Sequence, residues 1–185
     1  MRKAWRDMAA QTSDFGFDRL PGGAYAFLPR SNAMHFEITV DIDASPETVW
    51  RILTDIETWP EWTESMRSVR RLDSGKFTTG SRAEVRQPRL LATIWTVTEL
   101  IPGRSFTWRA TSPGVTTTAS HEVIDRTGLV TVRLVIDQAG SLAWLFGRAT
   151  ARLTRRYLEL ESHGLKQRAE SGREEHPLDA RPKDL

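Results

Sequence analysis

A helix start followed closely by a proline break constrains the fold of this chain more than any other feature. Ser45 is a good N-cap, Pro46 fits the first helical position, and Glu47 places a negative charge where the helix dipole favours one. The helix cannot continue cleanly through Pro60, so a second short helix is expected to be broken off near Trp59. The first helix carries an apolar stripe that must be buried: Val49, Leu53 and Ile56, with Trp50 and Ile52 beside it.

Alternating apolar and polar residues predict one strand before these helices and six strands after them. In the first strand, residues 35–43, four apolar side chains alternate with polar ones: Phe36, Ile38, Val40 and Ile42. Turn residues at Pro102-Gly103, Pro113-Gly114 and 126–128 separate several of the later strands and predict an antiparallel meander. The later strands are expected at residues 67–72, 81–87, 92–101, 104–112, 115–125 and 129–138.

A long amphipathic helix is predicted at residues 141–167. Arginines occupy the face opposite its apolar stripe, so the stripe must be buried against one face of a large sheet. The stripe consists of Leu142, Leu145, Phe146, Ala149, Leu153, Tyr157 and Leu160.

The order of strand, capped helix, Trp59-Pro60-Glu61-Trp62 break and new strand resembles the opening of the START-like polyketide cyclase/dehydrase and lipid-transport superfamily, also called SRPBCC. The resemblance extends from about His35 to about Gln167. It implies an α+β helix-grip fold, in which a seven-stranded antiparallel curved sheet wraps around a long C-terminal helix and two short helices follow the first strand. It also implies a cavity between sheet and helix that holds an apolar ligand.

The limits of the periodic patterns predict one folded domain at residues 34–168. Residues 1–33 show no sustained period of two or of 3.6 and are expected to be a poorly ordered extension, with Met34 as an alternative start of translation. Residues 169–185 are polar and charged, and are expected to be a disordered tail.

Composition excludes several classes of function. The chain has 185 residues and no cysteine, so disulfides and cysteine-based chemistry are absent. Its 26 basic and 24 acidic residues give a net charge of only +2, which does not indicate a nucleic-acid partner.

The chain contains no apolar stretch of about 18 residues, so no integral membrane segment is expected, and the cytoplasm is the expected location. Known cofactor and metal motifs are missing, and no cofactor or metal is expected. The oligomeric state is left open.

The turns allow the inward face of the sheet to be estimated. With Pro102-Gly103 as a two-residue loop, Glu99 opposes Phe106 and Val97 opposes Trp108, and Trp95 shares their face. If Asp125 opposes Gly128 at the next turn, one further inward face is strongly apolar apart from a histidine: Ala119, His121, Val123, Val130, Val132 and Leu134.

His121 and Glu99 are therefore polar side chains on an apolar face, and each needs a partner, a water molecule or a ligand. A core or rim histidine with a satisfied hydrogen bond is the commoner explanation of His121, and a solvated strand end is the commoner explanation of Glu99. One tryptophan of residues 59–62 is expected to cover an end of the cavity. The candidate ligand-binding residues are Trp59, Trp62, Trp95, Val97, Glu99, Phe106, Trp108, His121, Val132, Phe146 and Leu153.

Three functions are consistent with these patterns. The leading hypothesis is the binding or transport of a hydrophobic small molecule such as a lipid, isoprenoid, quinone or polyketide. The alternative is an enzyme resembling polyketide aromatase/cyclases, with His121 as a weak candidate for the acid or base. Such an enzyme would need polar residues in the cavity, and few are predicted. A third hypothesis, a protein that docks on a partner through its exposed sheet edge or C-terminal helix, would be favoured by a cavity filled with side chains.

Overall fold

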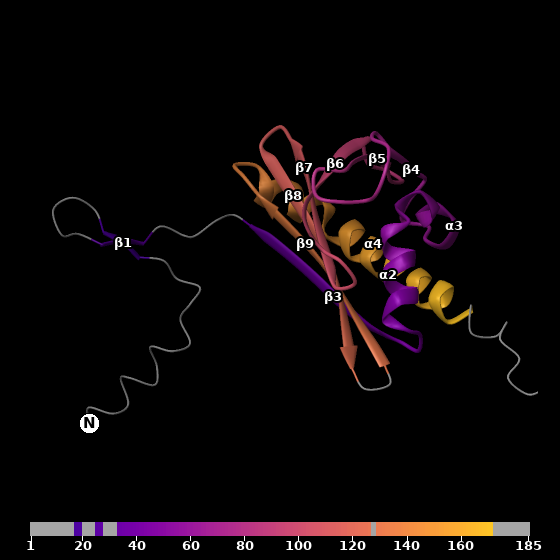
Figure 1. Ribbon diagram of the computed structural model, residues 1–185. Coiled ribbons are helices and arrows are strands. Elements are labelled where there is room, and N and C mark those ends of the chain that lie inside the picture. The colour runs from indigo at the N-terminus through magenta and orange to yellow at the C-terminus, as the bar shows by residue number, and fades with distance from the viewer. Residues whose placement is uncertain (1–16, 20–24, 28–32, 127–128, 172–185) are drawn as a thin grey trace, which may run out of the picture.

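The computed structural model describes residues 33–126 and 129–171, together with the backbone of two short strands, β1 (Phe17–Arg19) and β2 (Tyr25–Phe27). These two strands pair with each other and form a sheet of their own (Figure 1). The predicted domain limits at residues 34 and 168 stay a prediction.

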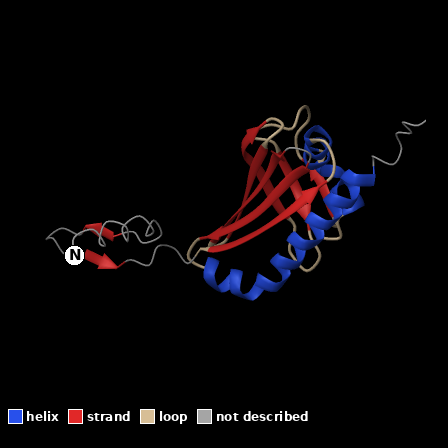
Figure 2. Ribbon diagram, turned by 90° about the horizontal axis from the view of Figure 1, so that it is seen from below, coloured by secondary structure: helices blue, strands red, loops and turns tan. Residues whose placement is uncertain are grey.

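The main body is one antiparallel sheet of seven strands with helices on its concave side (Figures 1 and 2). The strand order across the sheet is β3-β9-β8-β7-β6-β5-β4, so the first strand pairs with the last and the remaining pairs are hairpins. The elements are β3 (Met34–Ile42), α2 (Pro46–Thr54), the 3-10 helix η1 (Ile56–Thr58), α3 (Trp59–Trp62), β4 (Ser68–Arg71), β5 (Arg82–Arg86), β6 (Thr93–Ile101), β7 (Ser105–Ser112), β8 (Val115–Arg126), β9 (Leu129–Ala139) and α4 (Ala143–Ser171). The predicted helix-grip fold is confirmed.

The helical segment after β3 begins as its sequence predicts. The Ser45 hydroxyl accepts a hydrogen bond from the Thr48 backbone N–H at 3.2 Å, and Pro46 takes the first helical position. The break occurs in two steps, because a 3-10 turn lies between α2 and α3 and Pro60 falls within the first turn of α3.

Helix α4 runs across the concave side of the sheet and contacts β3, β9, β8 and the short helices (Figure 2). Of the predicted stripe only Tyr157 is buried. Leu153 and Leu160 are half-buried, and four members are exposed: Leu142, Leu145, Phe146 and Ala149. The helix packs closely at its C-terminal half, where a Cβ on Gly164 would meet the Trp62 backbone carbonyl. None of the described helices is both long and apolar enough to cross a membrane.

The register between β6 and β7 differs from the prediction at Glu99 and agrees with it at Val97. Ile101 pairs with Ser105 rather than Arg104, so the turn is longer than predicted and Glu99 pairs with Thr107 on the outer face. A register shift between Val97 and Glu99 then restores the predicted pairing of Val97 with Trp108.

The β8–β9 hairpin is also shifted, but by two residues, because Asp125 pairs with Val130 rather than Gly128. A slip of two residues keeps every side chain on its face. His121 and Val132 therefore lie on the inner face, as predicted.

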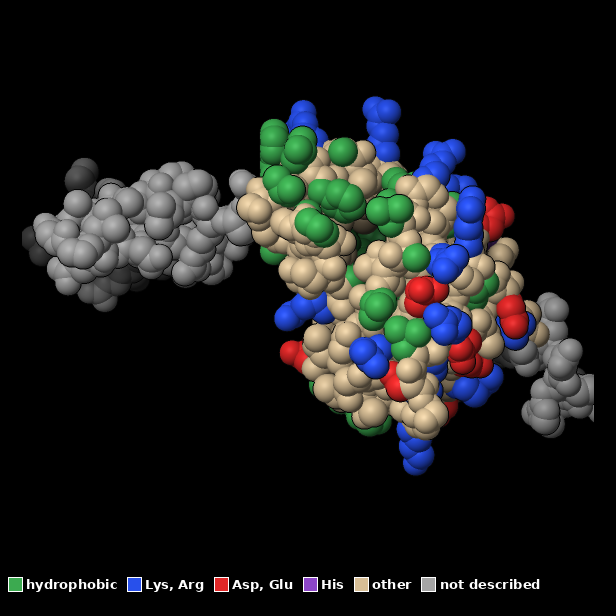
Figure 3. All heavy atoms as spheres, turned by 90° about the horizontal axis from the view of Figure 1, so that it is seen from above, with side chains coloured by type: hydrophobic (Ala, Val, Ile, Leu, Met, Phe, Trp, Pro, Cys, Tyr) green, Lys and Arg blue, Asp and Glu red, His purple; other side chains and the backbone are tan. Residues whose placement is uncertain are grey.

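Large apolar side chains are also found at the surface, and several belong to the beginning of α4. Figure 3 shows hydrophobic side chains gathered around a hollow on one face of the molecule, with Lys and Arg side chains nearby. The exposed large hydrophobic residues of the described chain are Leu91, Ile94, Ile101, Leu129, Leu142, Trp144, Leu145 and Phe146.

Candidate functional site

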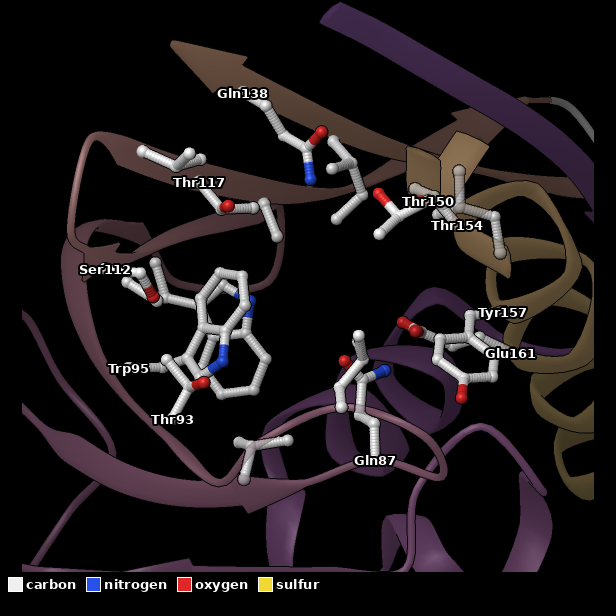
Figure 4. Close-up of a pocket in the computed structure, with 18 of the residues that line it drawn as sticks. Gln87, Thr93, Trp95, Ser112, Thr117, Gln138, Thr150, Thr154, Tyr157 and Glu161 are labelled. Carbon is white, nitrogen blue, oxygen red and sulfur yellow. The ribbon is translucent and has the colours of Figure 1, made fainter. Parts of the chain in front are cut away.

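A cavity of about 550 Å³ lies between the inner face of the sheet and α4. Strands β5 to β9 form one wall, the first half of α4 forms another, and the loop between β5 and β6 completes it (Figure 4). The sheet curves away from a helix whose first turns carry no long inward side chain other than Phe146, because Ala143 and Gly147 occupy the buried positions there. The volume is in the range of small-molecule pockets.

Three tryptophans form an aromatic wall of the cavity. The rings of Trp95 and Trp108 lie 5.1 Å apart, and Trp59 packs edge-on against Trp108 at 5.3 Å. Trp59 is held from behind, because its indole N–H donates to the Leu53 carbonyl at 3.2 Å. The wall is rigid and apolar, and it suits the flat or bulky surface of a hydrophobic molecule.

A buried imidazole–carboxylate pair lies in the cavity wall beside Trp59 and Trp108. His121 Nε2 on β8 is 2.9 Å from Glu161 Oε1 on α4, and the two side chains are only 4% and 9% exposed. Because an ionised carboxylate can only accept, the hydrogen bond forms when Nε2 carries the proton. Figure 4 shows the Glu161 carboxylate pointing into the cavity.

The imidazole of His121 is fixed on all sides. It stacks on the Phe106 ring at 4.4 Å with an interplanar angle of 10°, and the Trp59 ring lies 5.3 Å away. Its Nδ1 is buried and makes no hydrogen bond within the described part of the protein. Neither ring nitrogen is therefore open to the cavity, and Glu161 is the member of the pair that a ligand meets.

The loop between β5 and β6 closes the cavity beside Glu161. The Tyr157 hydroxyl on α4 donates to the Pro88 carbonyl and ties the helix to this loop. Burial raises the pKa of Tyr157 above its ordinary value, and the charge of Arg89 opposes that shift. Arg89 has a backbone φ of 63°, which is uncommon for a residue other than glycine and turns the loop over the cavity.

The cavity wall is more polar than predicted. Gln138 is 4% exposed, and its amide points into the cavity (Figure 4). Hydroxyl and amide groups of the wall come from β6 to β9, α4 and the β5–β6 loop. Those on the strands were not predicted, because small polar residues occur on either face of a strand. The polar residues of the wall include Gln87, Thr93, Ser112, Thr117, Gln138, Thr150 and Thr154.

Of the predicted ligand-binding residues, five line the cavity: Trp59, Trp95, Trp108, His121 and Phe146. Trp62 does not line it, and instead packs on Trp59 at 5.7 Å. Phe106, Val97 and Val132 point inward but are core residues, between 0% and 2% exposed. The remaining two do not line the cavity either: Glu99 is on the outer face of the sheet, and Leu153 is not among the α4 residues of the wall. Those residues are Phe146, Thr150, Thr154, Tyr157, Leu158 and Glu161.

Glu161 is the functional candidate that the sequence did not reveal. It follows Tyr157 by four residues on α4 and therefore lies on the same helical face. An acidic residue on the apolar stripe opposite an inward histidine was the available signal.

Comparison with known structures supports the fold at low sequence identity. A START superfamily protein from Mycobacterium smegmatis matches with a TM-score of 0.61 and 18% identity over 74% of this chain and 97% of that one. The di-domain ARO/CYC StfQ from the steffimycin biosynthetic pathway matches with a TM-score of 0.62 and 11% identity over 77% of this chain and 52% of that one. Ara h 8.0201 matches with a TM-score of 0.62 and 7% identity over 75% of this chain and 99% of that one. A comparison with curated protein sequences finds no match.

The seven-stranded sheet gripping a long C-terminal helix defines a START-like helix-grip protein. Within that class, the family model described as polyketide cyclase / dehydrase and lipid transport matches residues 33–170. The chain belongs to this family.

Proposed function

We propose that this protein binds a hydrophobic small molecule in the cavity between the sheet and α4. The observation that carries the proposal is the cavity of about 550 Å³ with its tryptophan wall. Burying a ligand against such a wall contributes roughly 25 cal/mol for each Å² of apolar surface, before the costs of association are subtracted. The family description, which includes lipid transport, supports the same function. A cytoplasmic location stays part of this proposal.

The polar part of the ligand is expected to be a hydrogen-bond donor. The Glu161 carboxylate faces the cavity, and His121 occupies one of its oxygen atoms. An ionised carboxylate accepts hydrogen bonds and repels a second carboxylate nearby. A hydroxyl-headed or amine-headed molecule therefore suits this position better than a fatty-acid anion.

The binding test uses N-phenyl-1-naphthylamine, an uncharged apolar fluorescent probe. The wild-type protein should enhance its fluorescence, and Trp95→Ala should weaken binding because it removes part of the wall. The matched control is Ile94→Ala, since Ile94 is the neighbouring residue on β6, is 53% exposed and does not line the cavity. No enhancement by the wild-type protein, or equal weakening by both variants, would exclude ligand binding in this cavity.

The polarity of the ligand is tested by competition between dodecanol and dodecanoate at neutral pH. Dodecanol should displace the probe at a concentration about tenfold lower, because a repulsion of about 1.4 kcal/mol between two carboxylates corresponds to a tenfold difference in affinity. Glu161→Gln should reduce the difference. If both compounds compete equally in the wild-type protein, Glu161 is not the anchor, and the binding proposal is left intact.

The buried pair also favours a second candidate function, an enzyme that removes a proton from a carbon next to a carbonyl. In this mechanism Glu161 is the base, and His121 is a positioning residue because neither of its nitrogens is open to the cavity. Deuterium incorporation into 1-tetralone in D₂O measures such proton removal. The enzyme would be favoured if the wild-type protein and Trp95→Ala exchange deuterium faster than buffer and Glu161→Gln does not. Exchange at the buffer rate would leave binding as the function.

A further inference from the structure

The first turns of α4 expose a group of large apolar side chains at the edge of the cavity. Phe146 and Leu91 are exposed at the surface and also line the cavity, so they lie at its mouth. This group is called the apolar tip and consists of Leu91 at 89% exposure, Leu142 at 50%, Trp144 at 52%, Leu145 at 60% and Phe146 at 41%. Single exposed apolar residues are ordinary, but a cluster beside a cavity indicates an interaction surface.

The apolar tip is part of the folded body. The Leu142 backbone N–H donates to the Gly114 carbonyl at 3.0 Å, which ties the start of α4 to the turn between β7 and β8. A Cβ on Gly114 would lie 2.8 Å from the Leu142 side chain, so the two segments are in close contact. The side chains of the tip are therefore presented by a defined surface.

Arginines continue from the apolar tip along the exposed side of α4. Residues 141–158 contain four arginines and no aspartate or glutamate, whereas the whole chain has a net charge of only +2. Arg148 follows Leu145 by three residues, Arg152 follows Arg148 by four, and Arg155 and Arg156 follow Arg152 by three and four, which places the arginines along one side of the helix. All four are exposed, and this arginine row consists of Arg148, Arg152, Arg155 and Arg156.

Most of this positive charge is not neutralised by the protein. Arg156 lies 4.0 Å from Glu159, at the limit of an ion pair, and Arg155 lies over the Phe36 ring at 5.7 Å. Arg148 and Arg152 make no ion pair with any residue that the structure describes. A row of cations beside exposed Trp and Leu side chains complements a surface that is negative outside and apolar beneath.

We propose that the apolar tip and the arginine row dock on an anionic phospholipid membrane, with the cavity mouth facing the lipid. The arginines would contact the phosphate groups while Trp144 and Leu145 enter the boundary between headgroups and acyl chains, which is the behaviour of basic amphipathic surfaces with an apolar edge. Phe146 and Leu91 would then lie at the membrane surface, and a hydrophobic molecule would pass between lipid and cavity without crossing water. This docking is independent of the identity of the ligand.

The experiment measures binding of the full chain to vesicles by co-sedimentation. Vesicles of phosphatidylcholine mixed with phosphatidylglycerol should bind the protein, vesicles of phosphatidylcholine alone should bind it weakly, and added salt should reduce the difference. Arg148→Gln with Arg152→Gln should weaken binding by roughly tenfold to thirtyfold, since each arginine near an anionic surface contributes a factor of about five. Leu145→Ser should also weaken it.

The matched controls change the same residue types at the opposite end of the sheet. Arg104 and Arg126 are exposed there. Arg104 lies roughly 25 Å from the tip by the length of β7, and Arg126, at the end of the longer strand β8, lies farther away. The double variant Arg104→Gln with Arg126→Gln should bind as the wild type does, and so should Ile101→Ser. Equal losses in the test and control variants would overturn the proposal.

Two other outcomes would also overturn it. Equal binding to charged and uncharged vesicles would show that the arginine row does not contribute. A dimer in sedimentation velocity that Leu145→Ser converts to a monomer would assign the apolar tip to a second copy of this chain instead. The two arginine substitutions are at exposed positions, so an unchanged melting temperature is expected, and their result does not depend on whether Leu145→Ser folds.

Discussion

His121 on β8 and Glu161 on α4 are joined across the cavity wall, with Nε2 and Oε1 2.9 Å apart. Both side chains are buried, and the imidazole stacks on Phe106 in the core. The bond therefore connects the inner face of the sheet with the helix that covers it. A ligand that binds the Glu161 carboxylate would act on this connection directly.

Replacing Glu161 with Leu should lower the free energy of unfolding by about 1–3 kcal/mol, because the buried His121 imidazole loses its only hydrogen-bond partner among the described residues. Urea unfolding measures the change. The double variant Glu161→Leu with His121→Phe should recover part of the loss, since neither buried polar group is then left unpaired. A double variant that is as unstable as the sum of the two single variants would contradict an energetic coupling between them.

Substitution by alanine should destabilise the protein much more at Gly164 than at Gly147, although both glycines lie in α4. Alanine usually favours a helix by about 1 kcal/mol over glycine. At Gly164 the new Cβ would meet the backbone carbonyl of Trp62, which cannot move without shifting α3, so Gly164→Ala should cost at least about 2 kcal/mol. At Gly147 it would meet the side chains of Met34 and Gln138, which can adjust.

Thermal unfolding of the two glycine variants provides the measurement. The melting temperature should fall substantially more for Gly164→Ala than for Gly147→Ala. An unchanged melting temperature in Gly164→Ala would show that the helix and α3 are not in contact at this point.

The sequence was sufficient for the fold because its signals are local. Capping at Ser45, alternation in the strands and turn residues each fix an element without knowledge of the others. The inner face around His121 could also be predicted, since a two-residue register error leaves side chains on the same face.

The site was harder to predict because it depends on distant pairings. Glu99 was misplaced because one extra turn residue moves a side chain to the opposite face. Glu161 is 40 residues from His121, and its role depends on how α4 is rotated over the sheet. Close packing of Gly164 against the Trp62 backbone carbonyl restricts that rotation, whereas Leu153 of the predicted stripe is only half-buried.

The imidazole of His35 should titrate above its ordinary pKa. Its Nδ1 lies 2.7 Å from Asp137 on the paired strand, and this hydrogen bond raises the pKa of His35, with Glu37 adding to the shift. A raised pKa in the folded state contributes stability below the unfolded value of 6.5, and the contribution is lost as pH rises through the folded pKa. Both side chains are more than half exposed, so the effect should be small and should decrease with salt.

Titration of the His35 ring protons by NMR measures this pKa. Asp137→Asn should lower it, because the charged hydrogen-bond partner is removed. A pKa for His35 that is the same in both proteins would contradict the interaction between β3 and β9 at this position.

Trp59 should be essential to the cavity, while Trp62 and Pro60 should not. Trp59 is fully buried, donates to the Leu53 carbonyl and contacts Trp108 at 5.3 Å, so Trp59→Ala should cost about 3–5 kcal/mol and weaken binding of N-phenyl-1-naphthylamine. Trp62 packs behind Trp59 and is absent from the lining, so Trp62→Ala should retain binding. Pro60→Ala should change both properties least, because alanine also suits the first turn of a helix. Trp59→Phe is the control for unfolding, because it keeps an apolar side chain at this position. If Trp59→Phe is folded and Trp62→Ala weakens probe binding more than Trp59→Phe does, the assignment of Trp59 to the cavity is wrong.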